Sequence, residues 1–251
     1  MILAGALSLG CLAQLVIGAA CSATPAPHTA VRPSVYYVSV QSLPHDRGFT
    51  VAGSLPQLRH AGASETAINE RLRWVVEQGI AQAEASVRPT SGRFAGGGEF
   101  TITPDRSLIS ANSVLVSALL PVTASRPYGT SSPYWLSVTI TVSSPKSAVS
   151  ISNVITAAGF GLLAKSLRER LQGNKCVEQL AGNDLSRASA PMASSFRQFA
   201  MLPAGLAVGF PASANGPLYE CGNPYVVIPY SKLAGAMSPA GKTLATAASV
   251  R

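Results

Sequence analysis

Side chains suited to acid–base or metal chemistry are scarce in this sequence of 251 residues. Only 12% of the residues are charged, and there are three histidines, four cysteines and 11 acidic residues. No HExxH or CxxC metal-binding pattern and no GxSxG nucleophile motif occurs. The run AGKT at 240–243 is not a phosphate-binding loop, because Ala236 stands where that motif requires glycine. We therefore expect a protein that is not an enzyme and that holds no metal and no cofactor.

Basic residues outnumber acidic ones by 19 to 11, which gives a net charge of +8. They are scattered singly or in pairs, such as Arg71 with Arg73 and Arg168 with Arg170. Proteins that bind nucleic acid usually concentrate such charges in a cluster, so nucleic acid is not an expected partner. A diffuse positive surface favours anionic wall polymers or lipid head groups instead.

The first 20 residues resemble an export signal. Residues Ile2 to Ala20 carry no charge, and small residues precede Cys21. This order is typical of a cleavable signal peptide, here 1–20. A cysteine directly after the cleavage site resembles the lipobox of bacterial lipoproteins, so we expect Cys21 to carry a lipid. There are two alternatives. One is ordinary secretion, and the other is an uncleaved membrane anchor, because the run is long enough to span a bilayer.

Three cysteines remain besides Cys21. Cys11 would be removed with the signal peptide, which leaves Cys176 and Cys221. In an exported protein two such cysteines usually form a disulfide, which we expect here, with two separate buried thiols as the alternative. Residues 21–33 are rich in proline and are expected to form a spacer.

Helical periodicity is clearest from Ser64 to Ala85. Its apolar residues recur at intervals of three and four and predict a buried stripe of Ile68, Leu72, Val75, Val76 and Ile80. Ser64 is the expected N-cap, and Arg71 is expected to be exposed. Trp74 and Trp135 are both expected in the core, because a tryptophan buries a large area.

The other segments alternate between strand-like and helical patterns without a regular repeat. A second helix is predicted from about Ala157 to Gln172, and a short one near Ser231 to Met237. Strands are predicted at Ser34–Gln41, on both sides of Pro104–Arg106, at Tyr134–Ser144, and in the runs FAMLPAGLAVGF and YVVIPY. This order favours an α+β fold, mostly antiparallel sheet with two main helices packed on it, over a parallel doubly wound sheet.

Two parts of the sequence resemble a known extracytoplasmic module. The matching positions are Leu55-Pro56-Gln57, Ile68-Asn69, Phe199, Gly205, Leu206, Phe210, Gly222, Val227, Ile228-Pro229-Tyr230 and Leu233. The pattern resembles the ectodomain of RsiV-type anti-sigma factors, a module also found ahead of some peptidoglycan deacetylase domains. Its ending is similar to that of mycobacterial secreted immunogenic proteins. The resemblance implies that residues 34–240 form an RsiV-like extracytoplasmic domain, and we expect 241–251 to be a flexible tail.

The resemblance implies an α+β fold and supplies no catalytic residues. In the anti-sigma factors the module senses lysozyme. Here no sigma-binding segment precedes the apolar run, so anti-sigma activity is not expected. Lysozyme is basic like this chain, so net charge opposes that encounter and lysozyme is not an expected partner.

Together these observations predict a non-enzymatic, exported and lipid-anchored protein that binds a partner at the cell envelope. The expected partners are another envelope protein or an anionic wall component, with the membrane contacted through the lipid anchor. Two alternatives stay open. One is an enzyme acting on wall polymers through a dispersed site, and the other is a secreted effector or antigen.

Overall fold

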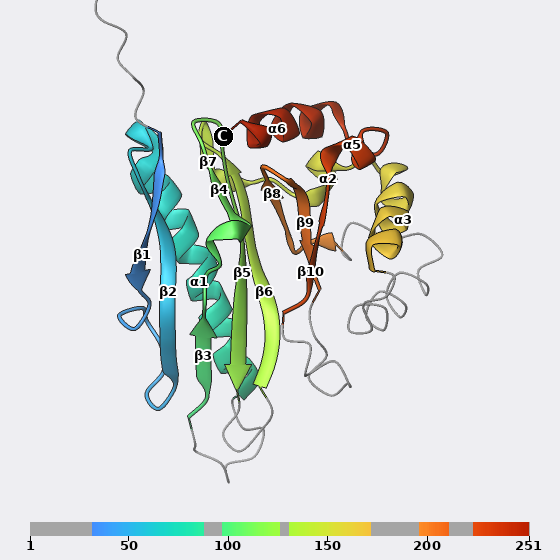
Figure 1. The fold of residues 1–251 in the computed structure, drawn as a ribbon. Helices are drawn as coiled ribbons and strands as arrows, with labels where there is room; N and C mark the ends of the chain where they lie inside the picture. Colours follow the sequence, from blue (N-terminus) through green and yellow to red (C-terminus); the bar gives the residue numbers. More distant parts are fainter. Residues whose placement is uncertain (1–31, 88–96, 126–130, 172–195, 211–222, 251) are drawn as a thin grey trace, which may run out of the picture. The chain divides into compact units, whose positions relative to one another are not determined.

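Two β-sheets and one long helix organise the chain (Figure 1). The computed structural model describes residues 32–87, 97–125, 131–171, 196–210 and 223–250. The strands are β1 (Ser34–Ser39), β2 (Thr50–Arg59), β3 (Glu99–Ile102), β4 (Ile109–Ala111), β5 (Leu115–Ser125), β6 (Ser131–Thr141), β7 (Ser144–Ala148), β8 (Phe199–Leu202), β9 (Gly205–Gly209) and β10 (Tyr225–Ile228). The helices are α1 (Glu65–Val87), α2 (Ile151–Val154), α3 (Gly159–Leu171), α5 (Tyr230–Leu233) and α6 (Pro239–Ser249), with 3-10 turns η1 (Gly62–Ser64) and η2 (Arg106–Leu108).

The larger sheet has seven strands in the order β1-β2-β3-β5-β6-β7, with β4 also paired to β5. Only the β2–β3 pair is parallel, and the others are antiparallel. Strands β5 and β6 form the longest ladder, from Leu115 opposite Thr141 to Ser125 opposite Ser131. Strand β7 adds only at one end of β6, where Ile140 lies opposite Ala148. The rest of the outer edge of β6 therefore has no strand beside it within the described residues.

Helix α1 covers one face of the larger sheet. The five residues of its predicted stripe are all buried, with Ile68 and Val76 at 0% exposure and Leu72 at 2%. They join a core with alternate residues of β5, among them Val116, Ala118 and Leu120. Burying each such side chain stabilises the fold by roughly 1.5–3 kcal/mol. The predicted helix and its buried stripe are confirmed.

The opposite face of the larger sheet packs against the second part of the chain. Strands β8, β9 and β10 form an antiparallel sheet, and β8 contacts both β5 and β6. Leu119 of β5 and Trp135 of β6 meet Ala200, Leu202 and Ala207 in this layer. Helix α3 packs against β10, so the second main helix covers the smaller sheet. The α+β class and the mostly antiparallel larger sheet are as predicted.

A small polar cluster lies between the two sheets. The hydroxyls of Ser117 and Thr139 are 2.6 Å apart and both residues are buried. The backbone N–H of Met201 in β8 donates to the Ser117 hydroxyl at 2.7 Å. Buried polar groups are costly unless they are hydrogen-bonded, so this cluster fixes the position of β8 on the larger sheet.

The flexible tail expected at 241–251 is corrected, because Pro239–Ser249 forms helix α6. Ser238 caps it by accepting from the N–H of Gly241, and Ala245 and Ala248 are buried at 5% and 0% exposure. The small side chains of this helix allow it to pack closely on α2. The same small residues produce no clear helical pattern of large apolar residues, so the sequence did not predict the helix. Ser64, predicted as the cap of α1, is the last residue of turn η1.

Several predictions concern residues outside those described. The signal peptide 1–20, most of the spacer 21–33, the lipid site Cys21 and the Cys176–Cys221 disulfide all lie there. Among the described helices, none combines the length and the apolar character needed to cross a membrane.

Candidate functional site

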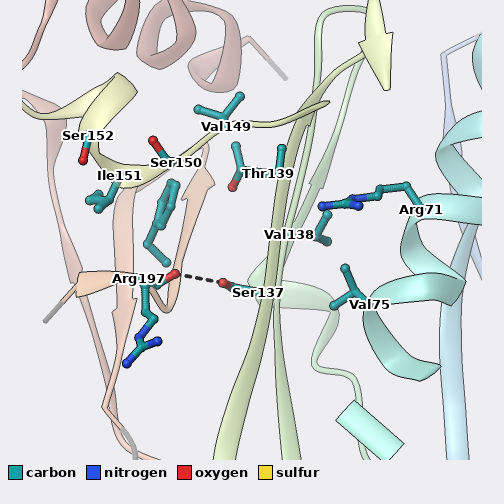
Figure 2. Close-up of a pocket in the computed structure, with 12 residues that line it drawn as sticks. Arg71, Val75, Ser137, Val138, Thr139, Val149, Ser150, Ile151, Ser152 and Arg197 are labelled. Atoms are coloured by element: carbon teal, nitrogen blue, oxygen red, sulfur yellow. Dashed lines mark hydrogen bonds between the residues drawn. The ribbon is translucent and has the colours of Figure 1, made fainter. Parts of the chain in front are cut away.

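A cavity of about 330 Å³ lies at the open edge of β6 (Figure 2). Its walls come from helix α1, from the middle of β6, from the segment that joins β7 to α2, and from the residues that lead into β8. We call this cavity the β6-edge groove. It exists because β7 leaves β6 after Ile140, where Val149 N–H donates to the Thr139 carbonyl at 2.7 Å.

Arg71 of α1 lines one side of the groove. Its Nε atom is buried and has no hydrogen-bond partner among the described residues. The guanidinium lies over the ring of Trp74, 4.1 Å from the ring centroid, in a cation–π contact. The expectation that Arg71 is exposed is therefore wrong, because the residue is half-buried. Trp74 lies three residues after Arg71 in α1, so the two side chains are on the same face of the helix and the indole ring covers the guanidinium.

Trp74 and Trp135 differ in their surroundings. Trp135 is 2% exposed and its indole N–H donates to the Pro224 carbonyl at 3.1 Å, so its predicted place in the core is confirmed. Trp74 is 45% exposed, which corrects the same prediction for that residue. It lies outside the apolar stripe of α1 and packs on Arg71 at the groove.

Arg197 lines the other side of the groove, just before β8. Its carbonyl accepts a hydrogen bond from the Ser137 hydroxyl at 3.1 Å, which ties this segment to β6. Its side chain is exposed. Figure 2 shows Arg71 and Val75 on one side of β6 and Arg197 on the other. The Arg71 guanidinium reaches towards β6, whereas the exposed Arg197 side chain lies on the other face of the sheet and points away from the other lining residues.

The remaining walls are mostly apolar, with hydroxyl groups between them. Apolar surface comes from residues of several elements, namely Val75, Val138, Val149, Ile151 and Phe199. Ser137 and Ser152 add hydroxyl groups, and no Asp or Glu is among the lining residues that the structure describes. The groove therefore combines two positive charges with an apolar floor, which suits a ligand that carries both an anionic and an apolar group.

Sequence reasoning missed Arg71 and Arg197 as site residues. A signal for Arg71 was present, because no acidic residue lies three or four positions away on its helix. Arg73 has Glu77 four positions on, and the two form an ion pair at 2.7 Å on the exposed side. No comparable signal marks Arg197, because its place beside β6 depends on the packing of β8.

Among the described residues, Asp105 and His45 are titratable groups that make hydrogen bonds with residues close to them in the chain. Asp105 accepts hydrogen bonds from the N–H and the hydroxyl of Ser107 in turn η2. His45 lies 2.7 Å from the Leu43 carbonyl through Nδ1. No group of three or more metal-ligating side chains occurs within the described ranges.

Two buried tyrosines are held as hydrogen-bond donors. Burial raises the pKa of Tyr134 and of Tyr230 well above the usual tyrosine value. The Tyr134 hydroxyl donates to the Gly79 carbonyl of α1 at 3.2 Å, and that of Tyr230 donates to the Leu202 carbonyl at 2.9 Å. Both hydroxyls therefore stay protonated at neutral pH and connect elements of the fold.

The residues that carry the sequence resemblance also hold the fold together. Asn69 accepts from the Leu58 N–H at 2.8 Å and donates to the Leu58 carbonyl at 3.0 Å, which pairs both backbone groups of that residue in β2. Gly205 has φ +146°, and a Cβ atom there would lie 2.1 Å from the Ile228 carbonyl oxygen. Neither Asn69 nor Gly205 lines the β6-edge groove. Of the positions that carry the resemblance, Phe199 alone is among the described lining residues, so the resemblance marks the fold more than this site.

Comparison with known proteins agrees at the level of the fold. No protein-family profile matches this sequence, and no curated protein matches it. A DUF3298 family protein from Pseudomonas aeruginosa PAO1 superimposes with a TM-score of 0.53 at 13% identity, covering 84% of this chain and 97% of that one. A DUF3298 family member from Bacteroides fragilis NCTC 9343 gives 0.51 at 11% identity, covering 82% and 94%. The chain thus has the fold seen in DUF3298 proteins over most of its length.

Proposed function

We propose that this protein is a non-enzymatic binding protein of the cell envelope, which captures an anionic group of its partner in the β6-edge groove. The observation that carries the proposal is the buried Arg71 Nε, which has no hydrogen-bond partner among the described residues. Leaving a buried polar donor unsatisfied costs about 1–3 kcal/mol, and more when it is charged. A carboxylate or phosphate of a ligand would supply the missing acceptor.

The chemistry of the groove supports binding. A guanidinium is positively charged and has hydrogen-bond donors but no acceptor, so the two arginines attract and orient anions. The planar guanidinium can pair with both oxygens of a carboxylate or phosphate, which gives geometric selectivity as well as affinity. The stack on Trp74 holds the Arg71 guanidinium in place and so reduces the entropy lost on binding.

The proposed place of action rests on features of the sequence. The apolar run at 2–20 and Cys21 support export and a lipid tether at the membrane surface. The partner is then an envelope protein or an anionic wall component. Membership of the DUF3298 family is coherent with the fold, and a relationship to the RsiV-type ectodomains is part of this proposal. Lysozyme is not the proposed partner, because it is cationic like this chain.

A test can separate a specific site from the effect of the net charge. The purified full chain in mild detergent is titrated with polyglutamate, and with neutral dextran as the comparison polymer. Arg71→Met and Arg73→Met each remove one positive charge from α1, but only Arg71 lines the groove. We expect Arg71→Met to weaken polyglutamate binding about tenfold or more, since bonds to charged groups contribute about 1.5–3 kcal/mol. Arg73→Met should leave binding within about twofold.

The same titration can contradict the proposal. Equal losses for the two variants would mean that polyglutamate responds to the net charge of +8 and not to the groove. Binding of dextran as tight as that of polyglutamate would exclude an anion site. Thermal melts of both variants would show whether any loss reflects unfolding.

A further inference from the structure

Within the described residues, the edge of β6 at the groove offers backbone groups that have no backbone partner, as well as side chains. In an antiparallel strand the backbone groups of alternate residues face the same neighbour. The Thr139 carbonyl faces outward, since it accepts from Val149, so Ser137 and Trp135 face outward too. Pro133 is the next such position and has no N–H to offer. The Thr139 carbonyl is already bonded to Val149, so the open edge is short and consists of the outward groups of Trp135 and Ser137.

The two arginines belong to the two faces of this same edge. Val138 packs in the core under α1, on the side of Arg71, whereas the Ser137 hydroxyl bonds to the Arg197 carbonyl on the other side. Figure 2 shows the same division. A strand lying beside β6 would have its side chains alternate between these faces. A residue opposite Ser137 would point towards Arg197, and its neighbour opposite Val138 towards Arg71.

We infer that the β6-edge groove binds an extended acidic peptide segment, which adds to β6 as a further strand and places two consecutive acidic side chains against Arg197 and Arg71. This inference rests on the proposed function and names its ligand class and binding mode. The outward N–H and C=O of Ser137 form the new backbone bonds. The positive charge at both faces, and the lack of Asp and Glu among the lining residues in the described part of the chain, complement such a segment.

The size and the apolar walls of the groove fit the same ligand. A cavity of about 330 Å³ holds one or two side chains and not a folded domain. Val138, Val149 and Ile151 give an apolar surface beside the edge, which suits an aliphatic residue next to the acidic pair. Strand addition of this kind obtains affinity from backbone bonds and selectivity from the alternating side chains.

The test uses capped four-residue peptides and the full chain in mild detergent. The parent peptide is acetyl-Val-Glu-Glu-Val-amide. One comparison peptide has Gln in place of both Glu residues, one has the order Val-Glu-Val-Glu, and one is N-methylated at the amide between the two Glu residues. Affinities are measured by calorimetry, and the exchange of the Ser137 amide hydrogen by NMR.

We expect the parent peptide to bind at least about tenfold more tightly than each comparison peptide. Arg71→Met and Arg197→Met should each weaken it about tenfold or more, while Arg73→Met should not, and the bound peptide should slow exchange at Ser137. Equal affinity of the parent and N-methylated peptides would overturn strand addition but leave the anion site intact. No preference for Glu over Gln would overturn both the inference and the proposed function.

Discussion

The two faces of the larger sheet are closed in different ways. One face is covered by α1, a single continuous stretch whose apolar residues recur with helical spacing. The other face is covered by β8, β9 and β10, with helices from later in the chain, and it includes the polar cluster of Ser117, Thr139 and Met201. The first layer depends on local pattern. The second depends on contacts between residues far apart in the chain, and the groove lies at the edge where the two layers meet.

The largest expected effect tests whether the two layers fold as one unit. Leu72→Ala opens a cavity under α1, and Leu119→Ala opens one under the smaller sheet, and both residues are at most 2% exposed. Each change should lower the free energy of unfolding by about 2–5 kcal/mol. Chemical denaturation followed by circular dichroism and by tryptophan fluorescence should show one shared transition for both variants. Two separate transitions for Leu119→Ala would mean that the layers fold independently.

A glycine pair sharpens the comparison within the second part of the chain. Gly205 combines φ +146° with the close approach of the Ile228 carbonyl, so a methyl group there strains the backbone and displaces β10. Gly205→Ala should lower stability by about 2–4 kcal/mol from the two effects together. Gly161 lies in α3 with open space where a Cβ atom would be, so Gly161→Ala should raise stability by about 0.5–1 kcal/mol. Thermal melts should shift in opposite directions, and a neutral Gly205→Ala would contradict this explanation.

This contrast explains which parts of the fold could be predicted from the sequence. The stripe of α1, the strand pattern of β6 and the α3 helix follow from spacing within a few turns or residues. No local sequence pattern predicts the parallel pairing of β2 with β3 or the hydrogen bond that places β8 on Ser117. Both depend on which surfaces pack together in the folded chain. The groove belongs to this second class. Arg71 could be noticed from its helix alone, but Arg197 reaches the site only through tertiary packing.

Asn69 offers a test at the first layer that does not involve apolar packing. Its side-chain amide makes two hydrogen bonds with the backbone of Leu58, as the backbone of a neighbouring strand residue would do. Asn69→Ala should lower the free energy of unfolding by about 1–3 kcal/mol, because both backbone groups of Leu58 lose their partner. Asn69→Asp keeps the acceptor and loses the donor, so urea denaturation should place it between Ala and the wild type. A loss for Asp that exceeds the loss for Ala would show that charge, and not the missing donor, dominates.

The comparison that is most informative about function is that of Arg71 with Arg73, and it includes the smallest expected effect on stability. Arg73 forms an exposed ion pair with Glu77, so Arg73→Met should lower stability by about 0.3–0.5 kcal/mol. Arg71→Met removes a charged group whose Nε is buried and has no partner among the described residues. It also loses the contact with Trp74, which contributes about 0.5–1 kcal/mol at an exposed site.

Relief of an unsatisfied donor is worth about 1–3 kcal/mol and the lost contact with Trp74 costs about 0.5–1 kcal/mol, so the net result for Arg71→Met should be a gain of between about 0 and 2.5 kcal/mol. If Arg71 is kept for binding at the expense of stability, thermal melts should show a gain in stability for Arg71→Met and a loss for Arg73→Met. Binding should then be lost for Arg71→Met alone. If Arg71→Met instead destabilises the fold more than Arg73→Met does, Arg71 serves the packing of α1, and the anion site would lose its central residue.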